Sequence, residues 1–453
     1  MTAPYVIFIV AAGVAVLLLL ILKLRISAFI ALLITSILVG IMAGMPLSAI
    51  TDSIQEGMGS TLGFVATIVG LGAIFGQMLE SSGGAASLAR YLISAFGKER
   101  ASWALMLTGF FIGVPIFLDV GFIILIPVVY ALARDTKRSV LFYAIPLLAG
   151  LAVTHTMVPP TPGPVAVADI LGAEIGWVIL FGIITAIPSA IIAGPLFGRY
   201  IASRIYVAPP EALEANEGRG GEEELKPPSF WIIAALILTP LTLIVAGTFT
   251  GLAVDRGIIS ESLITEIISF TGHPFTALII ATLLSILLCL KRKMSGQMIL
   301  DLSTKALGPA GIIILVTGAG GVLKQILVDS GIGTALAESV SGSHIPVIIL
   351  AWVLAALVRI TQGSATVAMI TSAGIIAPVL SLVNTDQIQT ALIVVSIASG
   401  ATIMSHVNDS GFWIVSKYLG MDEKQTLRSW TLMETIIAVT GLAVTLTLSL
   451  LFA

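Results

Sequence analysis

Long apolar runs, separated by short polar stretches, dominate the chain. Examples are residues 5–22, 62–79, 177–198 and 431–453. Each run is close to the ~20 residues that a helix needs to cross about 30 Å of hydrocarbon. Transmembrane β-strands alternate apolar and polar residues over about ten positions, whereas these runs are apolar on every side. The pattern predicts an all-α integral membrane protein in which each run is an apolar span.

Two halves of the chain carry related sequence. Residues 70–89 align without gaps with residues 318–337. Duplicated halves are common in secondary transporters. We therefore predict two inverted-topology repeats, in residues 1–205 and 229–453.

Each predicted repeat contains a re-entrant helical hairpin and a broken transmembrane helix. In the first half the hairpin covers about 101–133 and the broken helix about 139–171; in the second half these are about 345–383 and 388–418. Irregular backbone at membrane depth persists only where protein or a water-filled cavity covers it. The interruptions are therefore expected to mark a binding site.

The positions of Lys and Arg predict the orientation of the chain. Basic clusters belong in the cytoplasm by the positive-inside rule. The apolar segment 101–133 has such clusters at both ends, so its hairpin is expected to enter and leave from the cytoplasmic side. The segment 345–383 lacks basic flanks and is expected to enter from outside. An odd number of crossings per half then inverts the second half and places both termini outside.

Composition supports a membrane protein with one soluble connector. Hydrophobic residues make up 57% of the chain and charged residues 10%, whereas soluble domains have about 25% charged residues. The net charge of −3 arises from residues 206–228, which contain six Glu but only two basic residues, Arg219 and Lys226. With its Pro and Gly content, this segment is expected to be an acidic cytoplasmic linker.

Nothing in the sequence predicts a metal or another cofactor. Cys289 is the single cysteine, and His155, His273, His344 and His406 lack metal-ligand spacing. No nucleic-acid partner is expected. We look instead for polar groups that could hold a small organic solute.

The first hairpin carries Pro115 and Asp119 within apolar sequence. Proline interrupts a helix, and a buried carboxylate is costly unless it is paired, bound to a cation or protonated. Asp119 is therefore a candidate for proton or ion coupling. The alternative is an aspartate that caps the second arm of the hairpin.

The first broken helix is interrupted by a proline-rich segment, residues 154–164. Its freed amides and hydroxyls, with the helix N-terminus that follows, favour an anionic group. The substrate-binding candidates here are Thr154, His155, Thr161 and Gly163, with His155 also a coupling candidate. An ordinary extramembrane loop is the alternative.

The second hairpin concentrates polar groups between apolar arms. An arginine can hold a carboxylate by two parallel hydrogen bonds. Alternatively, Arg359 pairs with Asp119 or Asp409 for structural reasons alone. The substrate-binding candidates are Arg359, Thr361, Gln362, Gly363, Ser364 and Thr366.

The second broken helix is interrupted by hydroxyl, amide, imidazole and carboxylate groups, which suit a polyhydroxylated ligand. His406, Asn408, Ser410 and Gly411 are candidates for substrate binding. Asp409 and His406 are candidates for proton coupling, because histidine titrates near neutral pH. A structural role for His406 is the alternative.

At these segments the chain resembles the gluconate permease family of the ion-transporter superfamily. The resemblance rests on GVPIFLDVGF (113–122), HTMVPPTPGP (155–164), RITQGSATVA (359–368) and SHVNDSGFW (405–413). It implies proton symport of gluconate or a related sugar acid across the bacterial inner membrane. It also implies a homodimer that works by elevator-type alternating access.

Other functions are weighed against this resemblance. Carriers in the family also take fructuronate, glycerate or D-serine, so another hydroxy or amino acid anion is the nearest alternative. A channel is disfavoured because two different hairpins in one chain are unlike the symmetric rings that line pores. An enzyme is disfavoured because the sequence lacks GxSxG and HExxH motifs.

Overall fold

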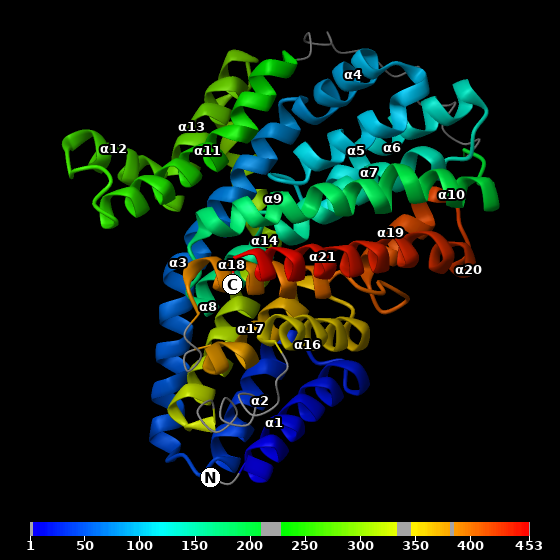
Figure 1. Ribbon diagram of the computed structural model, residues 1–453. Helices are drawn as coiled ribbons and strands as arrows, with labels where there is room; N and C mark the ends of the chain where they lie inside the picture. Colours follow the sequence, from blue (N-terminus) through cyan, green and yellow to red (C-terminus); the bar gives the residue numbers. More distant parts are fainter. Residues whose placement is uncertain (1–2, 210–227, 333–345, 381–384, 453) are drawn as a thin grey trace.

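A computed structural model describes residues 3–209, 228–332, 346–380 and 385–452. Every regular element in these ranges is a helix, which confirms the all-α prediction (Figure 1). Among them, seven helical segments are long and apolar enough to cross a membrane. Most of the predicted linker 206–228 and both ends of the predicted hairpin 345–383 lie outside the described residues.

The first half consists of helices that vary widely in length. A π-helical turn, η1, extends α1 into a longer rod. Another π-helical turn, η3, joins α9 to α10, so these three elements form one rod. The bounds are α1 Ala3–Leu18, η1 Leu19–Lys23, α2 Ala28–Met42, α3 Leu47–Ser81, α4 Gly84–Phe96, η2 Lys98–Arg100, α5 Ala101–Ile112, α6 Leu118–Thr136, α7 Leu141–Met157, α8 Pro162–Leu171, α9 Ile175–Ile191, η3 Ile192–Leu196 and α10 Phe197–Arg204.

The described part of the second half begins with three helices. One long helix follows, then two helices joined by a tight turn, then two short helices separated by a non-helical segment, then a final rod. A short helix, α12, stands at the outer tip of a projecting group of three helices (Figure 1). The bounds are α11 Phe230–Asp255, α12 Leu263–Gly272, α13 Pro274–Lys291, α14 Gly296–Asp329, α16 Val347–Gln362, α17 Ala365–Leu380, α18 Gln387–Gly400, α19 Ser410–Leu419, α20 Glu423–Thr426, η5 Leu427–Thr431 and α21 Leu432–Leu451.

The two longest helices, α3 and α14, pack against each other in opposite directions. Near one end of the pair, Ser53 donates a hydrogen bond to Asp329 over 2.5 Å. Further along, Gly70 of α3 faces Leu307 of α14. Residue numbers therefore rise along α3 while they fall along α14. This antiparallel contact brings the two halves of the chain together along most of both helices.

The helix breaks follow from local sequence. Proline at 159, 160, 162 and 164 removes backbone donors, and α7 ends at Met157 before them. The next helix, α8, then starts with Pro162 in its first position, where a missing N–H costs nothing. In the second half α18 ends at Gly400, and α19 begins after Asp409 caps it by accepting a hydrogen bond from the Gly411 amide at 3.1 Å.

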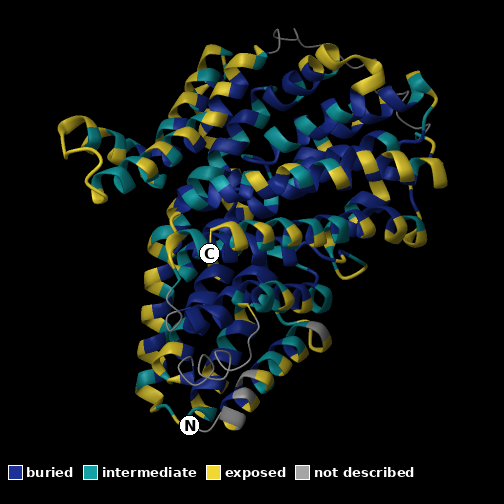
Figure 2. Cartoon of the chain, viewed as in Figure 1, coloured by how far each residue is buried: buried dark blue, intermediate teal, exposed yellow. Residues whose placement is uncertain are grey.

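The central helices are packed closely through small residues. Side chains on α7, α17 and α18 are almost all buried, and Figure 2 shows this buried centre surrounded by more exposed helices. Gly109 of α5 and Gly150 of α7 leave no space for a β-carbon between the two backbones. Small residues at such crossings allow the close approach on which helix association in lipid depends. The centre is therefore a rigid platform for the chain segments that interrupt it.

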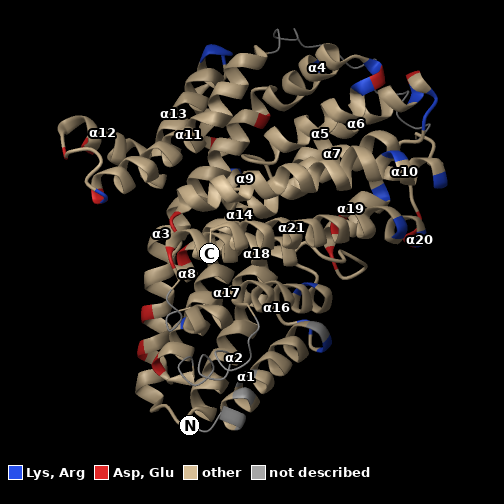
Figure 3. Ribbon diagram, viewed as in Figure 1, with Lys and Arg blue, Asp and Glu red and all other residues tan. Residues whose placement is uncertain are grey.

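Charged residues lie mainly at the periphery. Figure 3 shows Lys, Arg, Asp and Glu gathered at helix ends and outer edges, while most of the central ribbon carries neither charge. Two charged residues in the described part of the chain are buried, Arg359 and Glu434, and both line one cavity.

Candidate functional site

A cavity of about 320 Å³ lies where the two helix–turn–helix units meet the two helix breaks. This volume is within the ~300–1,000 Å³ typical of small-molecule pockets. All four segments that the sequence singled out contribute to the lining. The polar and charged residues that line the cavity are Asp119, His155, Thr156, Arg359, Ser364, Thr366, Asp409, Ser410, Trp430 and Glu434.

Three helices direct their first turns at this cavity. The first turns of α6, α17 and α19 contribute Leu118, Ala365 and Ser410 to the lining. The amides of a first turn have no partner inside the helix, and the helix dipole places partial positive charge there. Helix N-termini that converge on one cavity form an environment suited to an anion.

Arg359 is the central cation of the cavity. Its residue is only 3% exposed, and its Nη2 lies 2.6 Å from Asp409 Oδ2. Its Nε and Nη1 are buried and have no hydrogen-bond partner among the described residues. The sequence left open whether this arginine pairs with a carboxylate or holds substrate; the structure gives it a carboxylate partner and leaves further donors free.

Asp409 is held by three donors. Its Oδ2 accepts from Arg359 and from the Ser405 hydroxyl, and its Oδ1 accepts from the Gly411 amide. Trp430 Nε1 in turn donates to Ser405 Oγ at 2.6 Å. This network fixes the position of the carboxylate, because three donors from different parts of the chain point at it.

Glu434 is a functional candidate that sequence analysis missed. It lies on α21, is 3% exposed, lines the cavity, and has a buried Oε1 without a partner among the described residues. We treated residues 431–453 as a uniform apolar span, although this run contains Glu434. A carboxylate within such a run is the signal that could have identified it.

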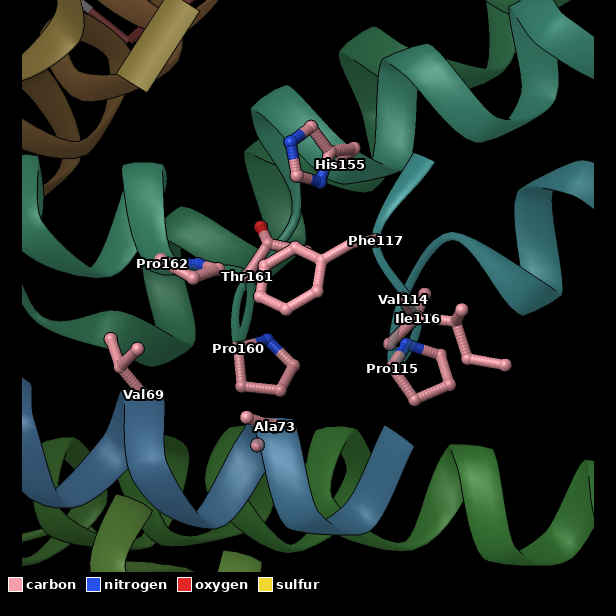
Figure 4. A pocket seen from close by; sticks show the side chains of 11 residues that line it. Val69, Ala73, Val114, Pro115, Ile116, Phe117, His155, Pro160, Thr161 and Pro162 are labelled. Carbon is pink, nitrogen blue, oxygen red and sulfur yellow. The ribbon is translucent and has the colours of Figure 1, made fainter. Parts of the chain in front are cut away.

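His155 lies at the junction of the main cavity and a small crevice beside α3. Figure 4 shows Pro160 next to Ala73 of α3, with Phe117 and Thr161 between Pro160 and His155. The rings of Phe117 and His155 meet edge to face, with centroids 6.0 Å apart. The Nδ1 atom of His155 is buried without a partner in the described part of the chain. The imidazole therefore has a free position for a proton or a polar ligand.

Asp119 has a different environment from the one expected. It lies in the first turn of α6, one position after the first helical residue, and its residue is exposed to the cavity. The expectation that burial would make its charge costly is therefore corrected, because open cavity surrounds the carboxylate. Phe117, not Asp119, occupies the capping position of α6.

Several other predicted site residues hold the turns in place. Gly363, with φ +88°, lies against the Asn408 backbone in a conformation that favours glycine. Asn408 Nδ2 donates to the carbonyl oxygens of Ile360 and Thr361, and His406 Nε2 lies 2.9 Å from the Ile360 oxygen. These contacts attach the α16–α17 turn to the α18–α19 break.

The remaining predicted residues use their polar groups locally. The hydroxyls of Thr154 and Thr361 donate to carbonyls of their own helices, and that of Thr161 donates to the Val158 oxygen. Gln362 Oε1 accepts from the Ser364 amide. Gly163 contacts Met369, which joins α8 to α17. Eight of the predicted residues are therefore absent from the main cavity lining: Thr154, Thr161, Gly163, Thr361, Gln362, Gly363, His406 and Asn408.

Comparison with known proteins identifies relatives over nearly the whole length. Residues 5–451 match the profile of GntP family permeases. The low-affinity gluconate transporter of Escherichia coli K12 is 42% identical over 431 residues, which cover 95% of each chain. The gluconate permease of Pseudomonas aeruginosa PAO1 is 42% identical over 436 residues, covering 96% of this chain and 95% of the relative.

A solved structure shares the fold. The crystal structure of the Alcanivorax borkumensis YdaH transporter aligns with a TM-score of 0.59 over 87% of each chain, at 13% sequence identity. The relatives are transporters, so the expectation that this chain is not an enzyme is confirmed. With its apolar spans and its match over residues 5–451, the chain belongs to the GntP family of permeases and is a multi-pass membrane protein.

Proposed function

We propose that the chain imports a sugar acid, gluconate, by proton symport across the bacterial inner membrane. The observation that carries the proposal is the Arg359 guanidinium, which keeps buried donors free beside an ion pair. A carboxylate fits these donors in a two-point arrangement. The hydroxyls of Ser364, Thr366 and Ser410 supply partners for a polyhydroxylated chain.

Charge also supports an anionic substrate. Three helix N-termini and one buried arginine face the same volume. A cationic solute would be repelled by the guanidinium, and a neutral solute would offer its free donors only uncharged acceptors, which form weaker hydrogen bonds than a carboxylate does. The names of the relatives agree with this class, since both are described as carriers of gluconate.

The transport cycle that we propose is an elevator. In this scheme α5–α8, α16–α19 and the rod of α20, η5 and α21 move together and carry the cavity, which Trp430 and Glu434 of the rod help to line. The α3 and α14 helices belong to the part that stays in place. The α5–α6 and α16–α17 units are the two re-entrant hairpins, and the halves are inverted repeats with the linker in the cytoplasm and both termini outside. The antiparallel packing of α3 and α14 is what inverted halves require. The working unit is proposed to be a homodimer.

Reconstituted protein tests the substrate. Liposomes containing the purified full chain and loaded with unlabelled gluconate should take up labelled gluconate by exchange. An acidic outer solution should then drive accumulation above equilibrium in liposomes without internal substrate. Failure of exchange with gluconate would refute the proposed substrate.

Competition separates the alternatives. Unlabelled fructuronate, glycerate and D-serine are added one at a time to the exchange assay. We expect gluconate to compete at the lowest concentration, because the cavity offers hydroxyl partners along its length as well as a carboxylate site. A lower inhibitory concentration for D-serine would reassign the substrate class to amino acids.

A further inference from the structure

Glu434 lies beside the Arg359–Asp409 pair, and nothing assigns it a function. Both carboxylates and the arginine line one cavity, and Glu434 is as deeply buried as Arg359. It lies within a continuous helical rod formed by α20, η5 and α21, so no free helix N-terminus surrounds it. The rod contains a π-helical turn at Leu427–Thr431, and such turns are frequent at functional sites.

The balance of charge in the cavity changes when an anion enters. Among the described residues that line the cavity, Arg359 is the one Lys or Arg side chain, and it faces the buried carboxylate of Glu434 and the part-buried carboxylate of Asp409. The substrate adds a further negative charge. A low-dielectric site disfavours such an excess, because charges there interact much more strongly than in water. Uptake of a proton by one carboxylate would therefore favour binding of the anion.

The two carboxylates are not equivalent for this purpose. Asp409 accepts from Arg359, Ser405 and Gly411, and these bonds would be weakened by protonation. Glu434 keeps Oε1 buried without a donor from the residues that the structure describes. A protonated carboxyl is itself a donor, so protonation of Glu434 also creates a hydrogen-bond donor inside the cavity.

The surroundings of Glu434 contain few other groups that titrate. Of the elements that contact α21, α16 contributes Arg359 to the cavity, α7 contributes His155, and the α18–α19 break contributes Asp409. The α9 helix and η3 carry no charged residue, and Arg428 of η5 is exposed. Asp119 faces the same cavity from α6 and is exposed.

We propose that Glu434 is the group that carries the coupled proton. This assignment rests on the proposed sugar-acid symport and deepens it. The Glu434 carboxylate takes one proton from the outer aqueous phase as the anion binds to Arg359. After the loaded site faces the cytoplasm, the anion leaves, the excess negative charge is relieved, and the proton returns to water. One anion and one proton move together, so the cycle transfers no net charge.

The matched variants are Glu434→Gln and Glu423→Gln, in the reconstituted full chain. Glu423 is an exposed carboxylate at the start of the same rod. Two measurements are compared: exchange of labelled gluconate without a gradient, and accumulation driven by an inward proton gradient with the membrane potential clamped. One proton per anion allows at most about tenfold accumulation for each pH unit of gradient.

We expect Glu434→Gln to keep exchange within a few-fold of wild type and to lose accumulation. Its affinity for gluconate should no longer change with pH, whereas wild-type affinity should fall by up to about tenfold per pH unit on the alkaline side. Glu423→Gln should match wild type in every measurement. Glu434→Asp should restore accumulation, because it retains a carboxylate that titrates.

The outcomes separate the two proposals. Accumulation by Glu434→Gln with wild-type pH dependence overturns the assignment and leaves gluconate transport standing. Absence of gluconate exchange in the wild-type protein overturns the proposed function, and the assignment with it. A further measurement needs no variant and is made in weak buffer on the alkaline side, where affinity falls with pH. Addition of gluconate to purified wild-type protein there should remove about one proton per bound anion from solution. Absence of proton uptake across that pH range in a protein that binds gluconate also overturns the assignment.

Discussion

The strongest prediction concerns replacement of Arg359 by lysine or by alanine. Lysine retains the positive charge beside Asp409 but lacks the planar fork of a guanidinium. Its ammonium is expected to stay with Asp409, so the donors that Nε and Nη1 supply are lost. Alanine removes these donors and also leaves the Asp409 carboxylate without its cation.

The magnitudes differ in a way that separates binding from folding. A hydrogen bond to a charged group contributes about 1.5–3 kcal/mol, so loss of two such bonds weakens gluconate binding by at least roughly 3 kcal/mol, or about 150-fold in Kd at the lower end of this range. Folding of the lysine variant should change little. The alanine variant should lose a further ~3–5 kcal/mol of stability, because it breaks a buried ion pair on one side.

Thermal unfolding with and without gluconate measures both effects. At 100 times the wild-type Kd, ligand stabilises the wild-type protein by about 2.7 kcal/mol, whereas a Kd raised about 150-fold leaves about 0.3 kcal/mol. Wild-type Kd in Arg359→Lys would refute the role of the free donors. Equal loss of stability in the lysine and alanine variants would refute the view that the charge alone maintains the fold around Asp409.

Three further predictions concern the surroundings of the cavity. Gly363→Ala should lower the free energy of unfolding by about 2–4 kcal/mol, because a β-carbon there meets backbone atoms and the left-handed φ adds roughly 1 kcal/mol. Gly420→Ala is the control, because Gly420 shares the positive φ but has no atom near its β-carbon position. In the same denaturation assay it should lose only the roughly 1 kcal/mol that comes from φ. Ser364→Ala should weaken gluconate binding by about 1 kcal/mol, or roughly fivefold in Kd. Thr154→Val should leave the Kd unchanged, because the Thr154 hydroxyl bonds to a carbonyl of its own helix. Equal Kd values in the two variants would remove Ser364 from the site. Asp119→Asn should lower the KM for gluconate several-fold at low salt by removing a like charge while accumulation persists; loss of accumulation would make Asp119 a coupling residue after all.

The broad fold could be predicted because it depends on local sequence. Apolar runs of sufficient length must form helices in lipid, since each backbone group has to be satisfied within its own segment. The prolines at 159–164 and the polar residues at 405–411 interrupt apolar sequence, and the chain leaves helical conformation at both places. The four motifs were enough to indicate the permease family.

Individual roles within the site depended on contacts that are distant in sequence. Glu434 went unnoticed because hydropathy averages one carboxylate into an apolar run, and its importance comes from Arg359 on another helix. Asn408 and Gln362 look like ligands for a hydroxy acid, yet they bond to backbone at the turns. The sequence does not say whether an amide faces a ligand or a carbonyl, since either satisfies its hydrogen bonds.

The sequence alone determined the class of protein, its all-helical fold and the segments where helices had to end. These follow from hydrophobicity and from proline and glycine, whose effects act within a few residues. Only the tertiary structure decided which polar groups share one cavity, that Arg359 pairs with Asp409, and that Glu434 is buried beside them. The physical reason is that the energy of a charge depends on its distance from other charges and from water, and packing of distant helices sets both distances.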